Sequence, residues 1–183
     1  MDDLLLTMTR VVNTLALSEI RFAVAGGCAV YARGGPPSGH DVDIFLRKQD
    51  VQPAVRTLRE AGMQSVDPPE NWLTKVYDGD TLVDLIFATS GRDVTDELLD
   101  RATTMRIGSA VAPVISATDL MIDKLNVLDA HRCDFAPLLH VARDLREQVD
   151  WSAVGRETGS SPYARAFLGL LEDLQIASTR PTR

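Results

Sequence analysis

The sequence predicts an α/β (α+β) protein in which a mixed-sheet lobe is followed by a helical lobe. Short apolar runs of strand type alternate with amphipathic helical patterns through residue 108, and almost every pattern after residue 116 is helical. We therefore expect a sheet-bearing lobe at 1–108 and a helical lobe at 109–183. With 45% hydrophobic residues in 183, the chain can bury a real core.

The elements follow from periodicity and from turn residues. Gly26 and Gly27 indicate a close backbone approach, Gly62 ends a helix, and Asp78-Gly79-Asp80 predicts a hairpin turn. In the first lobe we expect helices at 5–16, 28–33 and 51–61 and strands at 22–25, 41–46, 72–77 and 81–87. In the second we expect helices at 117–129, 134–147 and 162–174 and a frayed tail at 176–183, with Ser116 and Asp119 capping the first of them.

Two aspartates lie one residue apart on the second strand. Asp41 and Asp43 share a face of that strand, roughly 6–7 Å apart, because side chains alternate with a period of two. Two ionised carboxylates this close repel one another unless a cation lies between them. Mg²⁺ prefers oxygen ligands, commonly one or two carboxylates with water and substrate phosphates. The pair therefore predicts a divalent-metal site, for Mg²⁺ or Mn²⁺.

A third aspartate interrupts an apolar strand. Asp84 stands between Val83 and Leu85, and an acid in a strand buried on both faces is costly unless it is paired or metal-bound. Proximity to Asp41 and Asp43 would explain its presence.

These residues carry a resemblance to a known superfamily. Val24-Ala25-Gly26-Gly27, a spacer, Asp41-Val42-Asp43-Ile44 and then Val83-Asp84-Leu85 resemble the DNA polymerase beta-like nucleotidyltransferases. Residues 115–125 and 132–134 are most similar to the AbiEii and MenT branch, the toxins of toxin–antitoxin and abortive-infection systems. The spacer also resembles nucleotidyltransferases that modify lincosamides and aminoglycosides.

The resemblance implies an enzyme with an active cleft between its two lobes. Asp41, Asp43 and Asp84 would bind metal, Gly26 and Gly27 the phosphates of an NTP, and Asp84 would help to deprotonate the acceptor. Lys124, whose helical neighbours are apolar, would contact the triphosphate. Asp134 is a weaker nucleotide-binding candidate, since a first-turn acid also stabilises a helix start.

The acceptor stays open at this point. The C-terminal resemblance favours RNA, the tRNA 3′ end in particular, and implies a toxin with an antitoxin partner. An antibiotic nucleotidyltransferase is the first alternative, and a catalytically inactive nucleotide-binding module is the second. A net charge of −7 excludes nucleic-acid binding through bulk charge. RNA would need a local basic patch, for which the candidates are Arg33, Arg47, Lys48, Lys75 and Arg106.

The remaining signals concern location and the loop before the acid pair. Cys28 and Cys133 have no metal-ligand spacing, so both are expected to be buried free thiols of a cytoplasmic protein. No apolar run approaches membrane-spanning length, and the acidic start does not resemble a signal peptide. In the loop, Ser38 is a candidate phosphorylation site, and His40 is expected to be exposed.

Overall fold

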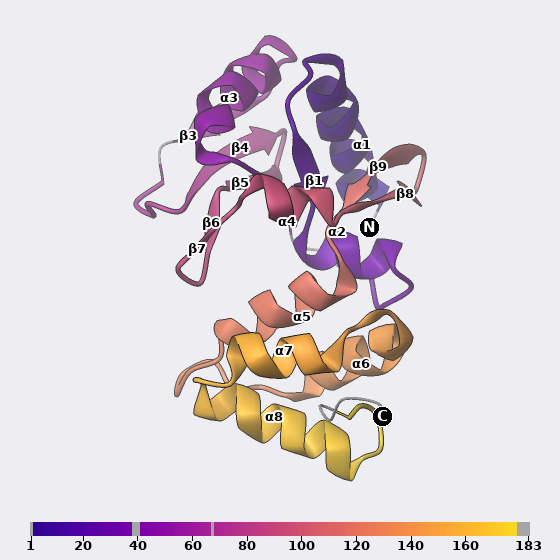
Figure 1. Cartoon of the computed structure of the whole chain (residues 1–183). Helices are drawn as coiled ribbons and strands as arrows, with labels where there is room; N and C mark the ends of the chain where they lie inside the picture. The colour runs from indigo at the N-terminus through magenta and orange to yellow at the C-terminus, as the bar shows by residue number, and fades with distance from the viewer. Residues whose placement is uncertain (1, 38–40, 67, 179–183) are drawn as a thin grey trace. The chain divides into compact units, whose positions relative to one another are not determined.

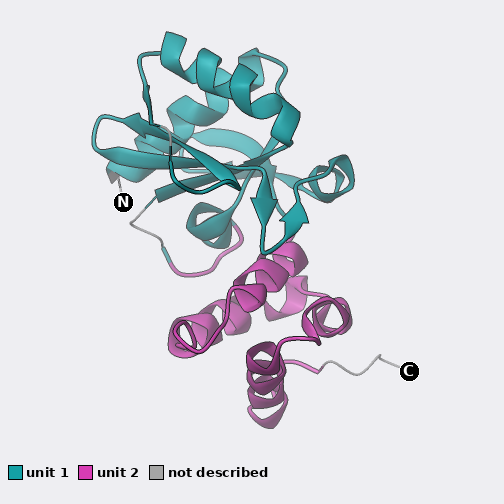
Figure 2. Cartoon of the chain, turned by 90° about the vertical axis from the view of Figure 1, so that its left-hand side faces the viewer, with its two compact units in different colours: residues 1–32, 37–115 teal, residues 33–36, 116–183 magenta. Residues whose placement is uncertain are grey.

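A computed structural model describes residues 2–37, 41–66 and 68–178 of the chain. Ser38 and His40 lie outside these described residues. The described chain divides into two compact units, one of residues 1–32 and 37–115 and one of residues 33–36 and 116–183 (Figure 2). No described helix combines the length and apolar character needed to cross a membrane.

Among the described residues, unit 1 contains nine strands and four α-helices. Its elements are α1 (Asp2–Leu17), β1 (Phe22–Val24), α2 (Gly26–Ala32), β2 (Asp41–Leu46), the 3-10 helix η1 (Lys48–Asp50), α3 (Val51–Glu60), β3 (Gln64–Val66), β4 (Leu73–Asp78), β5 (Thr81–Ile86), β6 (Ala88–Thr89), β7 (Arg92–Asp93), α4 (Asp96–Asp100), β8 (Thr103–Ile107) and β9 (Ala110–Val114).

Seven of these strands form one mixed sheet in the order β3-β4-β5-β2-β1-β9-β8. Strand β2 pairs antiparallel with β1 and parallel with β5, and β1 pairs parallel with β9. Helices α1 and α3 pack against one another and against the sheet (Figure 1). The prediction of an α/β (α+β) protein with a mixed sheet is confirmed.

Strand β2, which carries the acid pair, has one buried face and one partly exposed face. Val42, Ile44 and Leu46 have no exposed surface, whereas Asp41 and Asp43 are partly exposed. Burying three aliphatic side chains stabilises the fold by several kcal/mol, on the order of 1.5–3 kcal/mol each. The strand is therefore anchored by one face, and the other face is left for the carboxylates.

The last hairpin of the sheet was not expected from the sequence. Strands β8 and β9 pair around Gly108, so the expected lobe boundary at residue 108 falls in their turn. The contacts divide the chain after Ile115 instead, because β9 pairs with β1 and so belongs to the sheet of unit 1. The short elements α4, β3, β6 and β7 also lacked a clear periodic signal.

Unit 2 is helical over the residues described. It comprises α5 (Ala117–Asn126), α6 (Ala136–Leu145), the 3-10 helix η2 (Arg146–Gln148), α7 (Trp151–Thr158) and α8 (Pro162–Asp173). Its core includes Phe167, which meets the ring of Phe135 edge-on at 5.2 Å between centroids. Helix α7 was not expected; Asp150 caps it by accepting from the Ala153 N–H at 2.9 Å.

The two cysteines differ in exposure. Cys28 is buried in α2, as expected, but the expectation of a buried Cys133 is wrong because that residue is exposed. Cys133 precedes α6 in a non-helical stretch, so it has no packed helix face to join.

Candidate active site

The three predicted acids converge on the sheet. Strands β2 and β5 pair in register, so that Asp43 lies beside Asp84 and Asp41 beside Leu82. One carboxylate oxygen from each of Asp41, Asp43 and Asp84 lies within 4.8 Å of the other two. All three side chains are partly exposed, which leaves the cluster accessible to a ligand. Hard divalent cations such as Mg²⁺ bind oxygen donors of this kind.

The apolar residues around Asp84 suggest a strand buried on both faces, but the face that carries Asp84 is partly exposed. Its neighbours Val83 and Leu85 are fully buried on the other face, and Asp84 itself is only partly buried. Its Oδ1 atom is nevertheless inaccessible to solvent and has no hydrogen-bond partner among the described residues. An acceptor atom in this state favours a proton or a cation as its partner.

Burial is the main influence on the protonation of Asp84. It raises the pKa of the carboxyl above the ordinary value of 3.8, and the negative charges of Asp41 and Glu70 act in the same direction. The ammonium of Lys75 lowers that pKa and so opposes the shift. The net effect is to disfavour the ionised form of Asp84. A cation bound to the carboxylate would offset this effect, because it stabilises the negative charge.

Gly26 is shaped to fit the acid pair. Its φ is +54°, a conformation that side-chain-bearing residues rarely adopt, and a Cβ atom there would lie 1.7 Å from Oδ2 of Asp43. The backbone just before Gly26 is also tied to the acid pair, because the Ala25 N–H donates to the Asp43 carbonyl at 2.9 Å. The Gly-Gly motif and the acid pair are therefore one structural feature, and only glycine fits at position 26.

Helix α2 begins at Gly26, directly beside Asp43. Gly27 is the second residue of this helix, where backbone N–H groups have no partner within the helix. Such groups bind phosphate oxygens well. The sequence-based expectation placed the helix two residues later, so it identified the turn but not the helix start.

Cys28 lies under the acid pair without taking part in its chemistry. Its Sγ is 3.9 Å from the Asp41 carbonyl oxygen. Burial, followed by the charges of Asp43 and Asp41, raises the pKa of this thiol to about 12. The Cys28 thiol therefore stays protonated at neutral pH and is a poor nucleophile.

The two site candidates of unit 2 lie on different elements. Lys124 is partly exposed near the end of α5; its neighbours Leu120 and Met121 are buried, but Val127 is 46% exposed, so the lysine stands at the margin of the apolar stripe. Asp134 is exposed, and its Oδ1 accepts from the Ala136 N–H at 3.0 Å. That hydrogen bond closes a turn just before α6 and accounts for the acid structurally.

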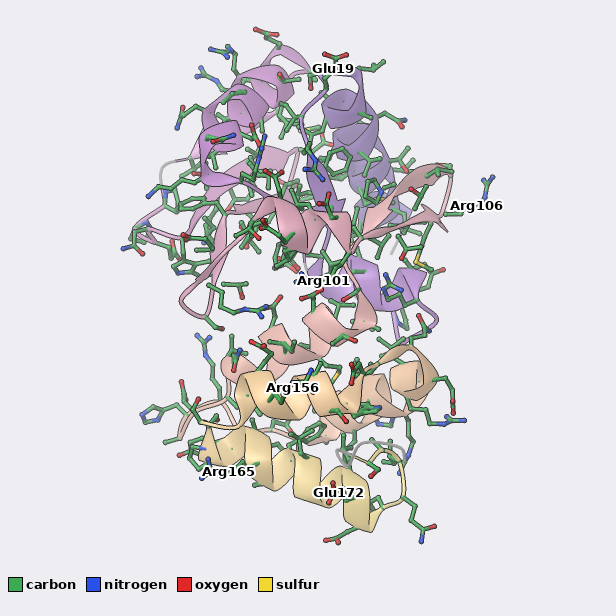
Figure 3. All side chains as sticks on the ribbon, in the orientation of Figure 1. Glu19, Arg101, Arg106, Arg156, Arg165 and Glu172 are labelled. Carbon is green, nitrogen blue, oxygen red and sulfur yellow. The ribbon has the colours of Figure 1, made fainter. Side chains whose placement is uncertain are left out.

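Most of the basic patch candidates are already engaged. Of the five, only Arg106, which is exposed on β8, has no side-chain partner in the part of the chain that the structure describes (Figure 3). The others pair as follows: Arg33 with Gln148, Arg47 with Asp50 and Asp96, Lys75 with Glu70, and Lys48 with the ring of Phe87. Engaged cations contribute less to binding a polyanion, because their existing partners must first be released.

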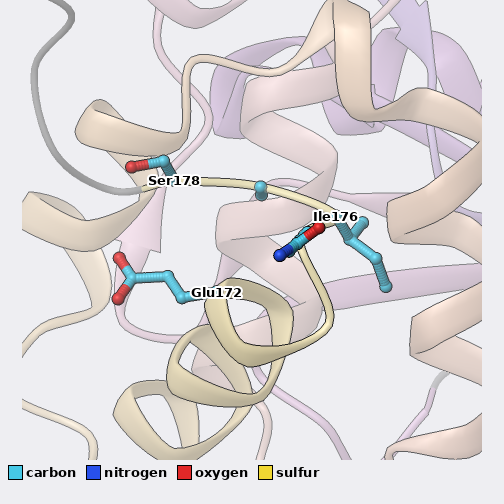
Figure 4. Close-up of a pocket in the computed structure, with 5 residues that line it drawn as sticks. Glu172, Ile176 and Ser178 are labelled. Carbon is cyan, nitrogen blue, oxygen red and sulfur yellow. The ribbon is translucent and has the colours of Figure 1, made fainter.

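A surface hollow in unit 2 contains none of the predicted site residues. It lies beside the end of α8 and is lined by Glu172, Gln175, Ile176, Ala177 and Ser178 (Figure 4). The acid cluster, by contrast, lies on the sheet of unit 1.

Comparison with known proteins identifies the fold. No model of a protein family matches the sequence, and no curated protein matches it. Among solved structures, the chain is similar to the antibiotic-resistance factor ANT(2'')-Ia, with a TM-score of 0.64, 14% identity and coverage of 96% of this chain and 98% of that one. A crystal structure of ANT(2'')-Ia in complex with adenylyl-2''-tobramycin gives a TM-score of 0.61, 11% identity and coverage of 91% and 97%.

The lincosamide antibiotic adenylyltransferase LnuA, bound to lincomycin, is also similar. Its TM-score is 0.54, with 12% identity and coverage of 75% of this chain and 92% of that chain. These likenesses show that the chain has the nucleotidyltransferase fold.

Proposed function

We propose that this protein is a metal-dependent nucleotidyltransferase that moves a nucleoside monophosphate from an NTP to an acceptor hydroxyl. The observation that carries the proposal is the convergence of Asp41, Asp43 and Asp84 within 4.8 Å, with Gly26 fitted against Asp43. The clustered acids destabilise the folded state when no cation is bound, because like charges repel. A catalytic cluster explains all of these residues together, which an inactive nucleotide-binding module does not.

The donor set fits a divalent cation. Asp41, Asp43 and Asp84 would hold Mg²⁺ or Mn²⁺, which when bound would neutralise phosphate charge and polarise the α-phosphorus. The orphaned Oδ1 of Asp84 supports this fit, because a buried carboxylate oxygen requires a positive partner.

The protein's own groups would bind and orient the substrates. Backbone N–H groups at Gly26 and Gly27 would donate to phosphate oxygens, and the glycine at position 26 keeps the approach to Asp43 clear. Asp84 would accept the proton of the acceptor hydroxyl, for which a raised pKa is an advantage. Lys124 would contact the triphosphate; this assignment rests on the resemblance of residues 115–125, and Asp134 receives no chemical role.

For the acceptor we favour a small hydroxylated molecule of the aminoglycoside or lincosamide kind. The net charge of −7 and the engagement of Arg33, Arg47, Lys48 and Lys75 support it over a polyanion. The likeness to ANT(2'')-Ia and LnuA supports it as well. RNA, with the tRNA 3′ end as target and an antitoxin as partner, is the second candidate, because residues 115–125 resemble the AbiEii and MenT branch.

The test is nucleotide transfer in a defined mixture. The protein is incubated with each α-labelled NTP and Mg²⁺, with tobramycin, lincomycin or total tRNA as the acceptor. We expect label in one acceptor class and its loss with Asp43→Asn, which removes a carboxylate while keeping its shape. Transfer by Asp43→Asn at a tenth of the wild-type rate or more would refute the acid cluster as the active site. Labelled tRNA with unlabelled antibiotics would establish the second candidate instead.

Lys124→Met separates the lysine's proposed role from packing. Methionine has a similar volume and suits the margin of an apolar stripe, so the stability of unit 2 should be unchanged. We expect weaker NTP binding and slower transfer. Loss of folding without a separate effect on NTP binding would assign Lys124 to structure.

A further inference from the structure

A lysine lies directly across the sheet from the third acid. Lys75 on β4 and Asp84 on β5 are register partners in an antiparallel pair. The β-carbons of such partners lie roughly 4.5–5.5 Å apart, well within the reach of a lysine side chain. The two strands are joined by the hairpin turn that Asp78-Gly79-Asp80 predicts, and their register places the two residues opposite one another.

The ammonium of Lys75 nevertheless pairs with a different carboxylate. Its Nζ lies 3.3 Å from Oε1 of Glu70, which precedes β4. Only 25% of the Lys75 side chain and 32% of the Glu70 side chain are exposed, so this ion pair is largely shielded from water. Meanwhile Oδ1 of Asp84 keeps no hydrogen-bond partner among the described residues.

Two partners thus compete for one cation. Asp84 offers a solvent-inaccessible acceptor oxygen to a lysine that is its register partner, and Glu70 holds that lysine elsewhere. An ammonium in contact with Asp84 would occupy the oxygen lone pairs that a metal ion needs. It would also place a positive charge next to that metal ion.

We propose that Glu70 is a positioning residue that holds Lys75 away from Asp84 and so keeps the Asp84 carboxylate open to the divalent cation. The inference rests on the metal site of the proposed function. Groups that orient metal ligands commonly change metal affinity by 10–100-fold when they are removed. Here the oriented group is a competitor rather than a ligand.

A double-mutant cycle tests this arrangement through metal affinity. Mn²⁺ binding is measured by electron paramagnetic resonance for the wild type, Glu70→Gln, Lys75→Met and the double variant. We expect Glu70→Gln to weaken Mn²⁺ binding roughly tenfold when Lys75 is present and less than about twofold in the Lys75→Met background. Glu60→Gln, at an exposed position at the end of α3, is the matched control and should leave affinity unchanged.

A charge effect alone would give a different pattern. Removing the Glu70 charge would then weaken Mn²⁺ binding by the same factor in both backgrounds, and this result would overturn the proposal. Glu70→Asp separates the two explanations further, because it keeps the charge but shortens the arm that reaches Lys75. We expect it to weaken binding partially; full wild-type affinity in Glu70→Asp would count against positioning.

The same measurement distinguishes this inference from the function on which it rests. Wild-type Mn²⁺ binding that disappears in Asp43→Asn supports the metal site independently of Glu70. Failure of the wild type to bind Mn²⁺ would overturn both, whereas binding without coupling between Glu70 and Lys75 would overturn only the positioning role. Melting temperatures in EDTA show that each variant is folded.

Discussion

At Gly26, a left-handed backbone and the carboxylate of Asp43 meet in a space that has no room for a side chain. We predict that Gly26→Ala abolishes Mn²⁺ binding and nucleotide transfer, because its Cβ would lie 1.7 Å from Oδ2 of Asp43 and displace that carboxylate. The left-handed conformation alone should cost about 1–2 kcal/mol of stability. Isothermal titration with Mn²⁺ and urea denaturation measure the two effects.

Gly79→Ala provides the matched control. Its φ of +60° is close to the +54° of Gly26, but a Cβ there meets nothing within 4 Å. It should therefore show the backbone cost without loss of Mn²⁺ binding. Equal Mn²⁺ affinities for the two variants would mean that the contact with Asp43 is unimportant.

The stability of the metal-free protein should depend on pH through Asp84. Burial raises its pKa above 3.8, so its contribution to stability is full below that value and is lost as the pH rises through the raised folded-state pKa. We predict that Asp84→Asn stabilises the metal-free protein at pH 7 and that the gain shrinks as the pH falls toward 4. Thermal unfolding in EDTA across this range measures it.

Asp78→Asn is the opposite case. The Asp78 carboxylate accepts hydrogen bonds from Thr7 and Arg10, so losing its charge should destabilise the protein at pH 7. A destabilising Asp84→Asn at that pH would show that the carboxylate has a stabilising partner in the metal-free protein.

At the scale of elements, the start of α5 combines a cap with a buried acid. Ser116 accepts from the Asp119 N–H at 3.0 Å, and its hydroxyl donates to Oδ2 of Asp119 at 2.6 Å. Asp119 is only 2% exposed. We predict that Ser116→Ala lowers the free energy of unfolding by about 2 kcal/mol, because it removes both a cap and a hydrogen bond to the buried Asp119 carboxyl.

The comparison for this prediction is Ser161→Ala at the start of α8. Ser161 accepts from the Ala164 N–H at 3.2 Å, and its hydroxyl has no acid partner among the described residues. Its loss should cost about 1 kcal/mol. Urea denaturation of the two variants resolves the difference, and equal costs would mean that the hydrogen bond to Asp119 adds nothing.

For the molecule as a whole, metal binding should raise the free energy of unfolding. A ligand that binds only the folded protein stabilises it by about 2.7 kcal/mol at 100 times its Kd. We predict that saturating Mn²⁺ raises the melting temperature relative to EDTA and that Asp41→Asn and Asp43→Asn abolish the rise. A rise of equal size in these variants would place the bound metal elsewhere.

The amino-acid sequence alone predicts the mixed-sheet and helical character of the chain and the acids of the site. Alternating acidic and apolar residues identified the strand of Asp41 and Asp43, and an acid among apolar residues marked Asp84. These signals are local, since each depends on residues within a few positions of one another. The expectation of a buried Cys133 is wrong, because the non-helical stretch before α6 gives that residue no packed helix face.

Only the tertiary structure decided which distant residues share the site. Strand order places β9 beside β1, and the register of β2 with β5 sets Asp43 beside Asp84. The fit of Gly26 against Asp43 and the capture of Lys75 by Glu70 likewise depend on positions in space. Pairing between strands depends on the packing of the whole sheet, so no local pattern in the sequence specifies these neighbours.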